Sequence, residues 1–273
     1  MQEILVQPWF KYVVGGIAIA FFIFKHFNKG VQEAKNEPAK FSASKTSDLT
    51  ENQLFSMALD SVMTAYWEVD SNTLSFTKNG KTPMSFKKYM KGWFIDTRDG
   101  YLSLTDHFLN HGRRGYLNTI YPIFKNEPKN SWEEKMAQAF PNGNDRAYKI
   151  LDKFDKYSLI DELKSKGIIE FDSDIEIGAL GYDVGMAIGQ ARRAFTAELI
   201  SEKEAWDIIN TATELAKQNF TSWDDFGKSH MIGYALDVYK LKGWTDYYQE
   251  YIHLYKSIKE NADSPWNTLE WQS

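Results

Sequence analysis

The chain of 273 residues contains no cysteine, so disulfide bonds, thiolate catalysis and cysteine-ligated zinc are all excluded. Positive charge is not in excess. The formal net charge of −5 argues against a nucleic-acid partner, because such proteins normally present a basic face to the phosphates. No glycine-rich loop follows a strand pattern, so no nucleotide-binding motif is recognised, and no internal repeat is visible.

No uncharged apolar run reaches the roughly 20 residues of an ordinary transmembrane helix. The longest run, Tyr12 to Phe24, lies between Lys11 and Lys25. These two lysines can extend their ammonium groups to water, and the aromatic residues around them suit the membrane interface, so the stretch from Trp9 to Phe27 becomes long enough. The sequence therefore predicts one N-terminal transmembrane helix within residues 1–28, with a buried core helix as the alternative.

Lysine residues are more frequent after this segment than before it. Lys11 alone precedes the run, whereas five lysines accompany or follow its end: Lys25, Lys29, Lys35, Lys40 and Lys45. Because the cytoplasmic flank of a transmembrane helix carries the excess of lysine and arginine, the remaining chain is predicted to be cytoplasmic. Residues 29–48 have the composition of a polar tether, and residues 49–273 that of one globular domain.

Signals for helix starts recur along this domain. Thr50-x-x-Gln53, Ser201-x-x-Glu204 and Ser222-x-x-Asp225 each place a side-chain acceptor at a helix start, followed by an acidic or amide residue that reaches back. Apolar residues between these starts follow a helical spacing, so we expect an all-α, multi-helix domain. The exception is Leu74-x-Phe76 before Asn79-Gly80, which indicates a minor β-hairpin.

The boundaries of several helices can be estimated. An opening helix is expected from about Leu49 to Tyr66, and another from about Ile177 to Leu199. The middle of the domain should be divided into short helices and loops by four residues, Pro122, Pro128, Pro141 and Gly143, with a candidate lobe boundary at Pro141 to Asn144.

The helix predicted at 177–199 can be divided into faces at 100° per residue. Its apolar stripe contains Ile177, Leu180, Val184, Ala187, Ile188, Ala191 and Phe195. Asp183 and Arg192 fall on opposite edges of that stripe, and Arg193 points away from it. We therefore expect Arg192 to contact another helix and Arg193 to face water.

Two later helices are predicted to be close-packed. Ala205, Ile209, Ala212 and Ala216 form a narrow face of small residues with Trp206 at its border, which permits close approach of a neighbour. From Ser222 onward the helix is apolar nearly all round, as expected for a central helix. His230 shares the face of Trp223, Phe226 and Gly233 and is expected to be buried.

Three landmarks fall in a fixed order in the last third of the chain. They are Tyr182-Asp183-x-Gly185 leading to Arg192, Ile200-Ser201-x-x-Glu204-Ala205-Trp206, and Ser222-Trp223-x-x-Phe226-Gly227 leading to Gly233. An earlier element contains Trp93-x-Ile95-x-x-Arg98 and Gly112-Arg113-Arg114. Over residues 49–240 the chain resembles the bacterial family known as domain of unknown function 1266 (DUF1266), which implies a shared fold but no established reaction.

The chain departs from that family's pattern at two places. The usual Trp-Asp-x-Gly-Arg is Tyr182-Asp183-Val184-Gly185-Met186 here, and the usual Gly-His-Arg has Arg113 in place of histidine. If the absent arginine and histidine carry a shared activity in the family, the resemblance implies that this member lacks it.

Candidate chemistry centres on polar residues near these motifs. The carboxylate of Asp183 could act as a base, the guanidinium of Arg192 could bind an anion, and the imidazole of His230 could transfer a proton. The same three residues could equally form a structural network of hydrogen bonds. Arg113 and Arg114 after Gly112 suit a phosphate or carboxylate, with capping or a surface role as the alternative.

Two further patterns have competing interpretations. His107 and His111 have the four-residue spacing of two metal ligands on a helix, but no third ligand is evident, so we expect no metal and no cofactor. Aromatic residues recur at helical spacing near the C-terminus, which is more typical of core packing than of a ligand or partner surface: Trp244, Tyr247, Tyr248, Tyr251, Tyr255, Trp266 and Trp271.

The sequence thus predicts a helical protein-binding module, accessory or immunity-like, tethered on the cytoplasmic side of a bacterial inner membrane and recognising an unidentified protein. The alternative is an enzyme or small-ligand-binding protein that uses Asp183, Arg192 and His230.

Overall fold

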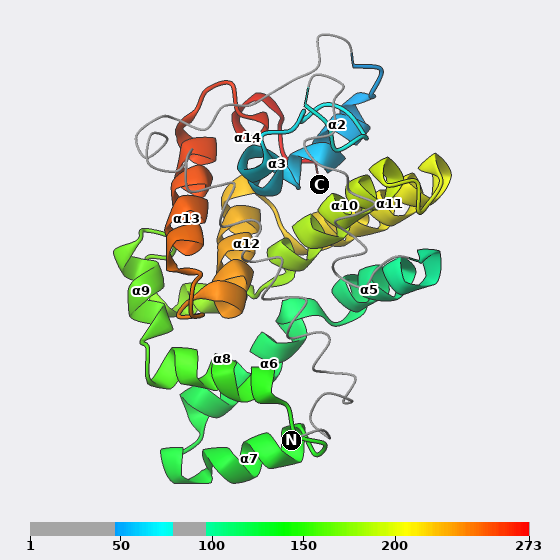
Figure 1. Ribbon diagram of the computed structural model, residues 1–273. Helices are drawn as coiled ribbons and strands as arrows, with labels where there is room; N and C mark the ends of the chain where they lie inside the picture. The colour runs from blue at the N-terminus through cyan, green and yellow to red at the C-terminus, as the bar shows by residue number, and fades with distance from the viewer. Residues whose placement is uncertain (1–46, 79–96, 273) are drawn as a thin grey trace.

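The computed structural model describes residues 47–78 and 97–272, and regular structure within these ranges is entirely helical (Figure 1). The all-α fold class is therefore confirmed. The predicted anchor, almost all of the tether, Asn79-Gly80, Trp93 and Ile95 lie outside the described residues. No helix within the described ranges has the length and apolar character needed to cross a bilayer.

The helices, in chain order, have the following bounds. They are α2 (Glu51–Ala58), α3 (Ser61–Trp67), α5 (Arg98–Asn110), α6 (Gly112–Asn126), the 3-10 helix η3 (Lys129–Ser131), α7 (Trp132–Ala139), α8 (Asp145–Asp155), α9 (Leu159–Ser165), η4 (Asp172–Ile177), α10 (Leu180–Thr196), α11 (Glu202–Asn219), α12 (Trp223–Val238), α13 (Thr245–Glu260) and α14 (Pro265–Thr268).

Helix α10 lies at the centre of the fold. It packs most extensively against α11 and α12, and also contacts α3, α5 and α6 (Figure 1). The predicted apolar stripe is buried from Leu180 to Ala191, and the small-residue face of α11 is fully buried against it. Helix α12 is buried along nearly its whole length, as its apolar composition predicts.

Glycines set the close approach of α10 and α12. A Cβ on Gly181 would stand 2.5 Å from the Phe226 carbonyl oxygen, and one on Gly233 would overlap Tyr182. Without side chains at these two crossings the backbones can approach directly. Helix packing therefore explains Gly181 and the motif residue Gly233.

Three expected boundaries are wrong. The opening helix is split into α2 and α3 at Leu59 and Asp60, where the buried Asp60 carboxylate turns toward Arg192. Pro122 lies inside α6 and does not end it, because the residue is exposed and the backbone acceptor that it leaves without a partner can face water. The helix predicted at 177–199 is shorter, since Gly178 with a φ of 85° separates η4 from α10.

The predicted helix caps are largely confirmed. Thr50 with Gln53 and Ser201 with Glu204 form reciprocal capping boxes. Ser222 accepts the backbone N–H of Asp225, but the shorter Asp225 side chain does not reach back and instead accepts a hydrogen bond from Thr221.

The described half of the predicted β-hairpin contains no strand, and its turn, Asn79-Gly80, lies outside the described residues. Within the described residues, Asp70 and Lys78 have single-residue bridge geometry, and the Asp70 N–H donates to the Thr77 carbonyl at 2.7 Å. Leu74 and Phe76, which were expected to be strand residues, lie in bends and irregular backbone. Phe76 instead fastens this segment to α10, because its N–H donates to Thr196 Oγ1 at 2.8 Å.

Candidate functional site

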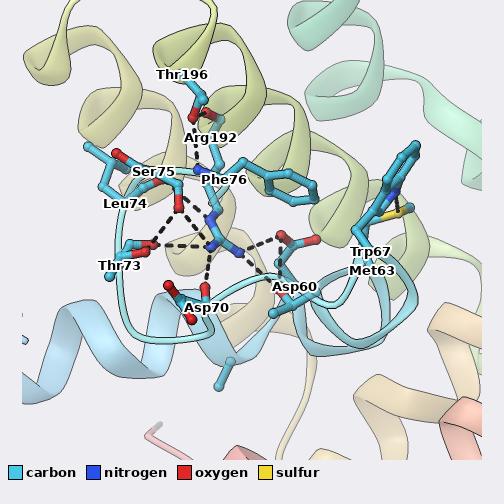
Figure 2. A network of polar contacts seen from close by, with 12 residues as sticks. Asp60, Met63, Trp67, Asp70, Thr73, Leu74, Ser75, Phe76, Arg192 and Thr196 are labelled. Carbon is cyan, nitrogen blue, oxygen red and sulfur yellow. Dashed lines mark hydrogen bonds and ion pairs between the residues drawn. The ribbon is translucent and has the colours of Figure 1, made fainter. Parts of the chain in front are cut away.

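Arg192 is fully buried on α10 and forms the first of three polar centres (Figure 2). Its Nη1 donates to Asp60 Oδ2 at 3.0 Å and to Thr64 Oγ1 at 2.9 Å. Nη2 donates to the backbone carbonyls of Asp70 at 2.7 Å and Thr73 at 3.1 Å. The guanidinium thus holds the irregular segment after α3 against the central helix, in agreement with the expectation that Arg192 contacts another element.

Asp60 is the charged partner of this arginine, and sequence reasoning missed it. It lies 132 residues away in the chain, in the break between two helices, where no spacing pattern indicates a site. Burial raises the pKa of the Asp60 carboxyl to about 6, and the charges of Arg192 and Arg193 act against that rise. Oδ1 of this carboxyl is buried without a hydrogen-bond partner in the described structure.

Arg193 is buried, and the prediction that it faces water is wrong. Only 2% of the residue is exposed. Its guanidinium lies 4.7 Å from the ring centroid of Phe76 and 5.8 Å from that of Trp67. The prediction failed because helices surround α10, so the side opposite its apolar stripe is also covered. Among the described residues its guanidinium makes no hydrogen bond or ion pair.

Asp183 forms the second centre, at the start of α6. Its carboxylate accepts the backbone N–H of Arg113 at 2.6 Å and that of Arg114 at 3.0 Å. No side chain of α6 itself caps this helix start. Gly112 has a φ of 54°, and a Cβ there would overlap the Asp183 carboxylate. Asp183 therefore caps α6 from another helix, and Gly112 supplies both the backbone conformation and the space that the cap needs.

Two of the residues at which the sequence departs from the family pattern, Tyr182 and Arg113, meet at Asp237 on α12. Nε and Nη2 of Arg113 donate to the Asp237 carboxylate at 3.0 and 3.1 Å, and the Tyr182 hydroxyl donates to it at 3.0 Å. The guanidinium and hydroxyl hold the pKa of this carboxyl below its usual value despite burial. Lys153 is buried nearby and donates to the carbonyls of Ala235 and Leu236, and burial lowers its pKa to about 8.

Arg114 also points inward, toward the end of α5. Nη1 donates to the Phe108 carbonyl at 2.8 Å and to Asp183 at 3.3 Å, and Nη2 donates to the Leu109 carbonyl. It therefore joins the end of α5 to the start of α6, the capping role that the sequence left open as an alternative. The two arginines after Gly112 are both engaged within the fold.

His230 forms the third centre, and its predicted burial is confirmed. Nε2 lies 2.9 Å from the Tyr251 hydroxyl and Nδ1 lies 3.3 Å from the Gly181 carbonyl. Since a carbonyl only accepts, Nδ1 carries the proton and Nε2 accepts from Tyr251. Burial lowers the pKa of His230 to about 4, so the ring is neutral near pH 7. A Cβ on Gly185 would stand 2.8 Å from this ring, which accounts for that glycine.

The structure brings Asp183 together with Arg113 and Arg114, and places Arg192 and His230 in two other networks. The two hollows identified on the described surface lie elsewhere. One lies between α6 and η4 and the other between α9, α12 and α13, and neither is lined by Asp183, Arg192 or His230. Each of these three residues has hydrogen bonds that can be explained by the stability of the fold.

His107 and His111 are neighbours, with ring centroids 6.2 Å apart. His107 is near the end of α5, while His111 lies between α5 and α6 and so is not on the same helix. Burial and the nearby Arg113 lower the pKa of His107. The described ranges contain no group of three or more potential metal-ligating His, Asp or Glu residues.

The aromatic motif residues pack in and around the core. Phe226 is fully buried, while Trp206 and Trp223 are partly buried against the core. Trp223 stacks on Trp266 at 5.8 Å, and its Nε1 donates to the Leu269 carbonyl at 2.8 Å. Tyr248, Tyr251 and Tyr255 are buried on α13, as the packing interpretation predicts.

Comparison with known proteins identifies a family but no reaction. No curated protein and no solved structure matches the chain. Residues 90–271 match the family described as "Protein of unknown function (DUF1266)". The match starts later than the resemblance seen in the sequence and extends through the C-terminal aromatic segment. The chain belongs to the DUF1266 family.

Proposed function

We propose that this chain is a membrane-tethered helical module that binds another protein and performs no catalysis at its motif residues. The observation that supports this proposal is the use of Asp183, Arg192 and His230 in three separate networks of the fold. Asp183 caps a helix, Arg192 fastens an irregular segment, and His230 joins α10 to α13 through Tyr251. Residues engaged in this way act as a scaffold, and a partner would be recognised by the surface they support.

The tether is the second part of the proposal. It rests on the apolar run from Tyr12 to Phe24 and on the lysines after it, which favour a position of the helical domain on the cytoplasmic side of a bacterial inner membrane. An accessory or immunity-like protein that meets its partner at the membrane would have this organisation.

The alternative is an enzyme or small-ligand-binding protein. It is favoured by the pKa of Asp183, which burial raises to about 6, because perturbed carboxyl groups are enriched at functional sites. The same burial follows from the capping role, so the pKa does not separate the two functions.

One experiment distinguishes protein binding from the alternative. The full chain is purified from native membranes in a mild detergent and examined by native mass spectrometry. The proposal predicts one stoichiometric protein partner, retained by Asp183→Asn molecules that remain folded. Recovery of a bound metabolite without a protein partner, lost in the Asp183→Asn variant, would contradict protein binding and support the alternative.

A further inference from the structure

Four large apolar and aromatic side chains among the described residues are exposed. Tyr148 lies on α8, Tyr157 in the α8–α9 turn, Phe171 after α9 and Leu241 in the α12–α13 turn, with exposed fractions of 38%, 44%, 61% and 42%. A single exposed apolar residue is ordinary on a protein surface. Tyr157 and Leu241 differ from the other two because a hydrogen bond joins the turns that carry them.

The α8–α9 and α12–α13 turns are fastened to one another. The Tyr239 hydroxyl donates to the carbonyl of Tyr157 at 3.0 Å. Ser158 and Lys240 have φ angles of 48° and 59°, a left-handed conformation that non-glycine residues adopt only where the surrounding structure fixes it. Tyr157 and Leu241 are thus presented on two defined turns that the Tyr239 side chain joins.

Lysines flank the exposed leucine. Lys240 and Lys242 are both exposed, and neither forms an ion pair within the described ranges. The Lys240 ammonium lies 5.2 Å from the centroid of the Tyr239 ring. The acidic residue that follows, Asp246, is in the first turn of α13, where it complements the N-terminal end of the helix. Half-buried Trp244 completes a Lys-Leu-Lys-Gly-Trp turn.

Other charges on the adjoining elements are largely paired. Lys156 beside Tyr157 pairs with Asp152 at 3.0 Å, and Glu162 on α9 pairs with Lys166 at 3.8 Å. Among the described residues, Lys240 and Lys242 directly flank Leu241 without an ion pair, and their sign is opposite to the net charge of −5 of the whole chain. The exposed Asp246, which also has no ion pair there, lies five residues after Leu241 in α13.

We propose that this corner, Tyr157 together with Lys240 to Trp244, contacts the anionic headgroup surface of the membrane to which the chain is tethered. Leucine and tryptophan side chains enter the interfacial layer, while lysines meet the lipid phosphates. Because the chain has a net negative charge, an anionic leaflet repels it as a whole. The corner with Lys240 and Lys242 is attracted instead, so it determines which face of the domain turns toward the lipid. The inference rests on the proposed tether, which at 20 residues spans at most about 70 Å and leaves the orientation open.

The absence of cysteine makes a site-specific test straightforward. The full chain with Leu241→Cys carries one fluorescent label at the corner, and Asn210→Cys carries the same label on an exposed position of α11 as the matched control. Both proteins are reconstituted into phosphatidylcholine vesicles with and without phosphatidylserine. Lipids with a quencher near the headgroup report whether the label reaches the membrane.

We expect quenching at position 241 to exceed that at position 210 severalfold in the vesicles with phosphatidylserine. Lys240→Glu with Lys242→Glu, or high salt, should remove most of this difference. Equal quenching at the two positions, or quenching unchanged by the charge reversal, would overturn the proposal. A chain that floats with vesicles after carbonate washing while position 241 stays unquenched retains its tether and loses only this inference, whereas loss of flotation overturns the tether and the orientation with it.

Discussion

The neighbouring arginines of α10 show how hydrogen bonding separates two equally buried charges. Arg192 donates to Asp60, Thr64 and backbone carbonyls, whereas Arg193 lies against two aromatic rings that contact each other. Arg192→Met leaves the Asp60 carboxylate buried without its cation, and we expect a loss of about 3–5 kcal/mol in the free energy of unfolding. Arg193→Met keeps the aliphatic packing and removes a buried charge, so the free energy of unfolding of this variant should differ from that of the wild type by no more than about 1 kcal/mol.

Urea denaturation of both methionine variants tests this difference. Arg193→Ala is the control for packing, because it removes the contacts with Phe76 and Trp67 and should cost about 1–3 kcal/mol. If the two methionine variants lose similar amounts of stability, the hydrogen bonds of Arg192 do not give it a larger contribution to stability than Arg193 has.

The substitutions that depart from the family pattern should be energetically coupled. Arg113 and Tyr182 both donate to the Asp237 carboxylate. In a double-mutant cycle of Arg113→Gln and Tyr182→Phe, we expect an interaction energy of about 0.5–3 kcal/mol, because both residues act on one acceptor. Repeating the cycle in an Asp237→Asn background should reduce that energy. Strict additivity in the original background would contradict the shared-acceptor arrangement.

His230 should make stability sensitive to acid. Its folded pKa of about 4 lies below the unfolded value of about 6.5, so the unfolded chain binds more protons between these pH values and stability falls as pH falls. The full difference corresponds to about 3 kcal/mol. Burial raises the pKa values of Asp60 and Asp183 to about 6, so between pH 4 and 6 the folded chain binds more protons at these two carboxyl groups than the unfolded chain does. Their contribution to stability therefore increases as pH falls, opposite to that of His230.

The contribution of His230 is therefore measured as a difference between proteins. The free energy of unfolding of the wild-type chain and of His230→Gln is measured at several pH values between 7 and 4. As pH falls, the variant should become more stable relative to the wild type. A constant difference between the two proteins across this range would show that the His230 ring does not titrate with a depressed pKa.

At the scale of the element, the start of α6 depends on a residue from α10. In Gly112→Ala, the new Cβ would overlap the Asp183 carboxylate, and a residue with a side chain would have to adopt a φ of 54°. We therefore expect the free energy of unfolding to fall by more than about 2 kcal/mol. Asp183→Asn retains the shape but not both acceptors, with an expected cost of about 1–3 kcal/mol.

Gly115 provides the matched control on the same helix. A Cβ there meets nothing within 4 Å, so Gly115→Ala should be neutral or stabilising by up to about 1 kcal/mol. Hydrogen exchange should show faster exchange at the first turn of α6 in Asp183→Asn and unchanged exchange in Gly115→Ala. Equal effects of the two glycine substitutions would contradict the cap.

Elements differ in how far sequence can predict them. The caps at Thr50 and Ser201 were predictable because donor and acceptor are three residues apart, and the α11 face because its period is local. Asp60 and Asp237 were not, since their arginine partners lie more than 100 residues away. Arg193 was misplaced for a related reason: periodicity gives the direction of a side chain on a helix, but not which neighbouring elements cover that direction.

At the scale of the whole molecule, the described core runs from Phe55 to Trp266 and closes with contacts from the C-terminal segment. Trp266 Nε1 donates to the Ala58 carbonyl at 2.8 Å, and Trp271 Nε1 donates to that of Phe220 at 3.0 Å. Both ends of the helical domain are thus joined within the described residues.

Deletion of residues 1–28 should therefore release a folded, soluble domain, because the described core is retained and the proposed anchor is removed. The truncated protein should leave the carbonate-washed membrane fraction and unfold cooperatively on heating, with the helical circular dichroism of an all-α domain. The full chain, expressed in parallel, is the control and should remain with the membranes. If the truncated domain aggregates, residues 1–28 belong to the core; if it stays folded but membrane-bound after carbonate washing, the anchor lies elsewhere in the chain.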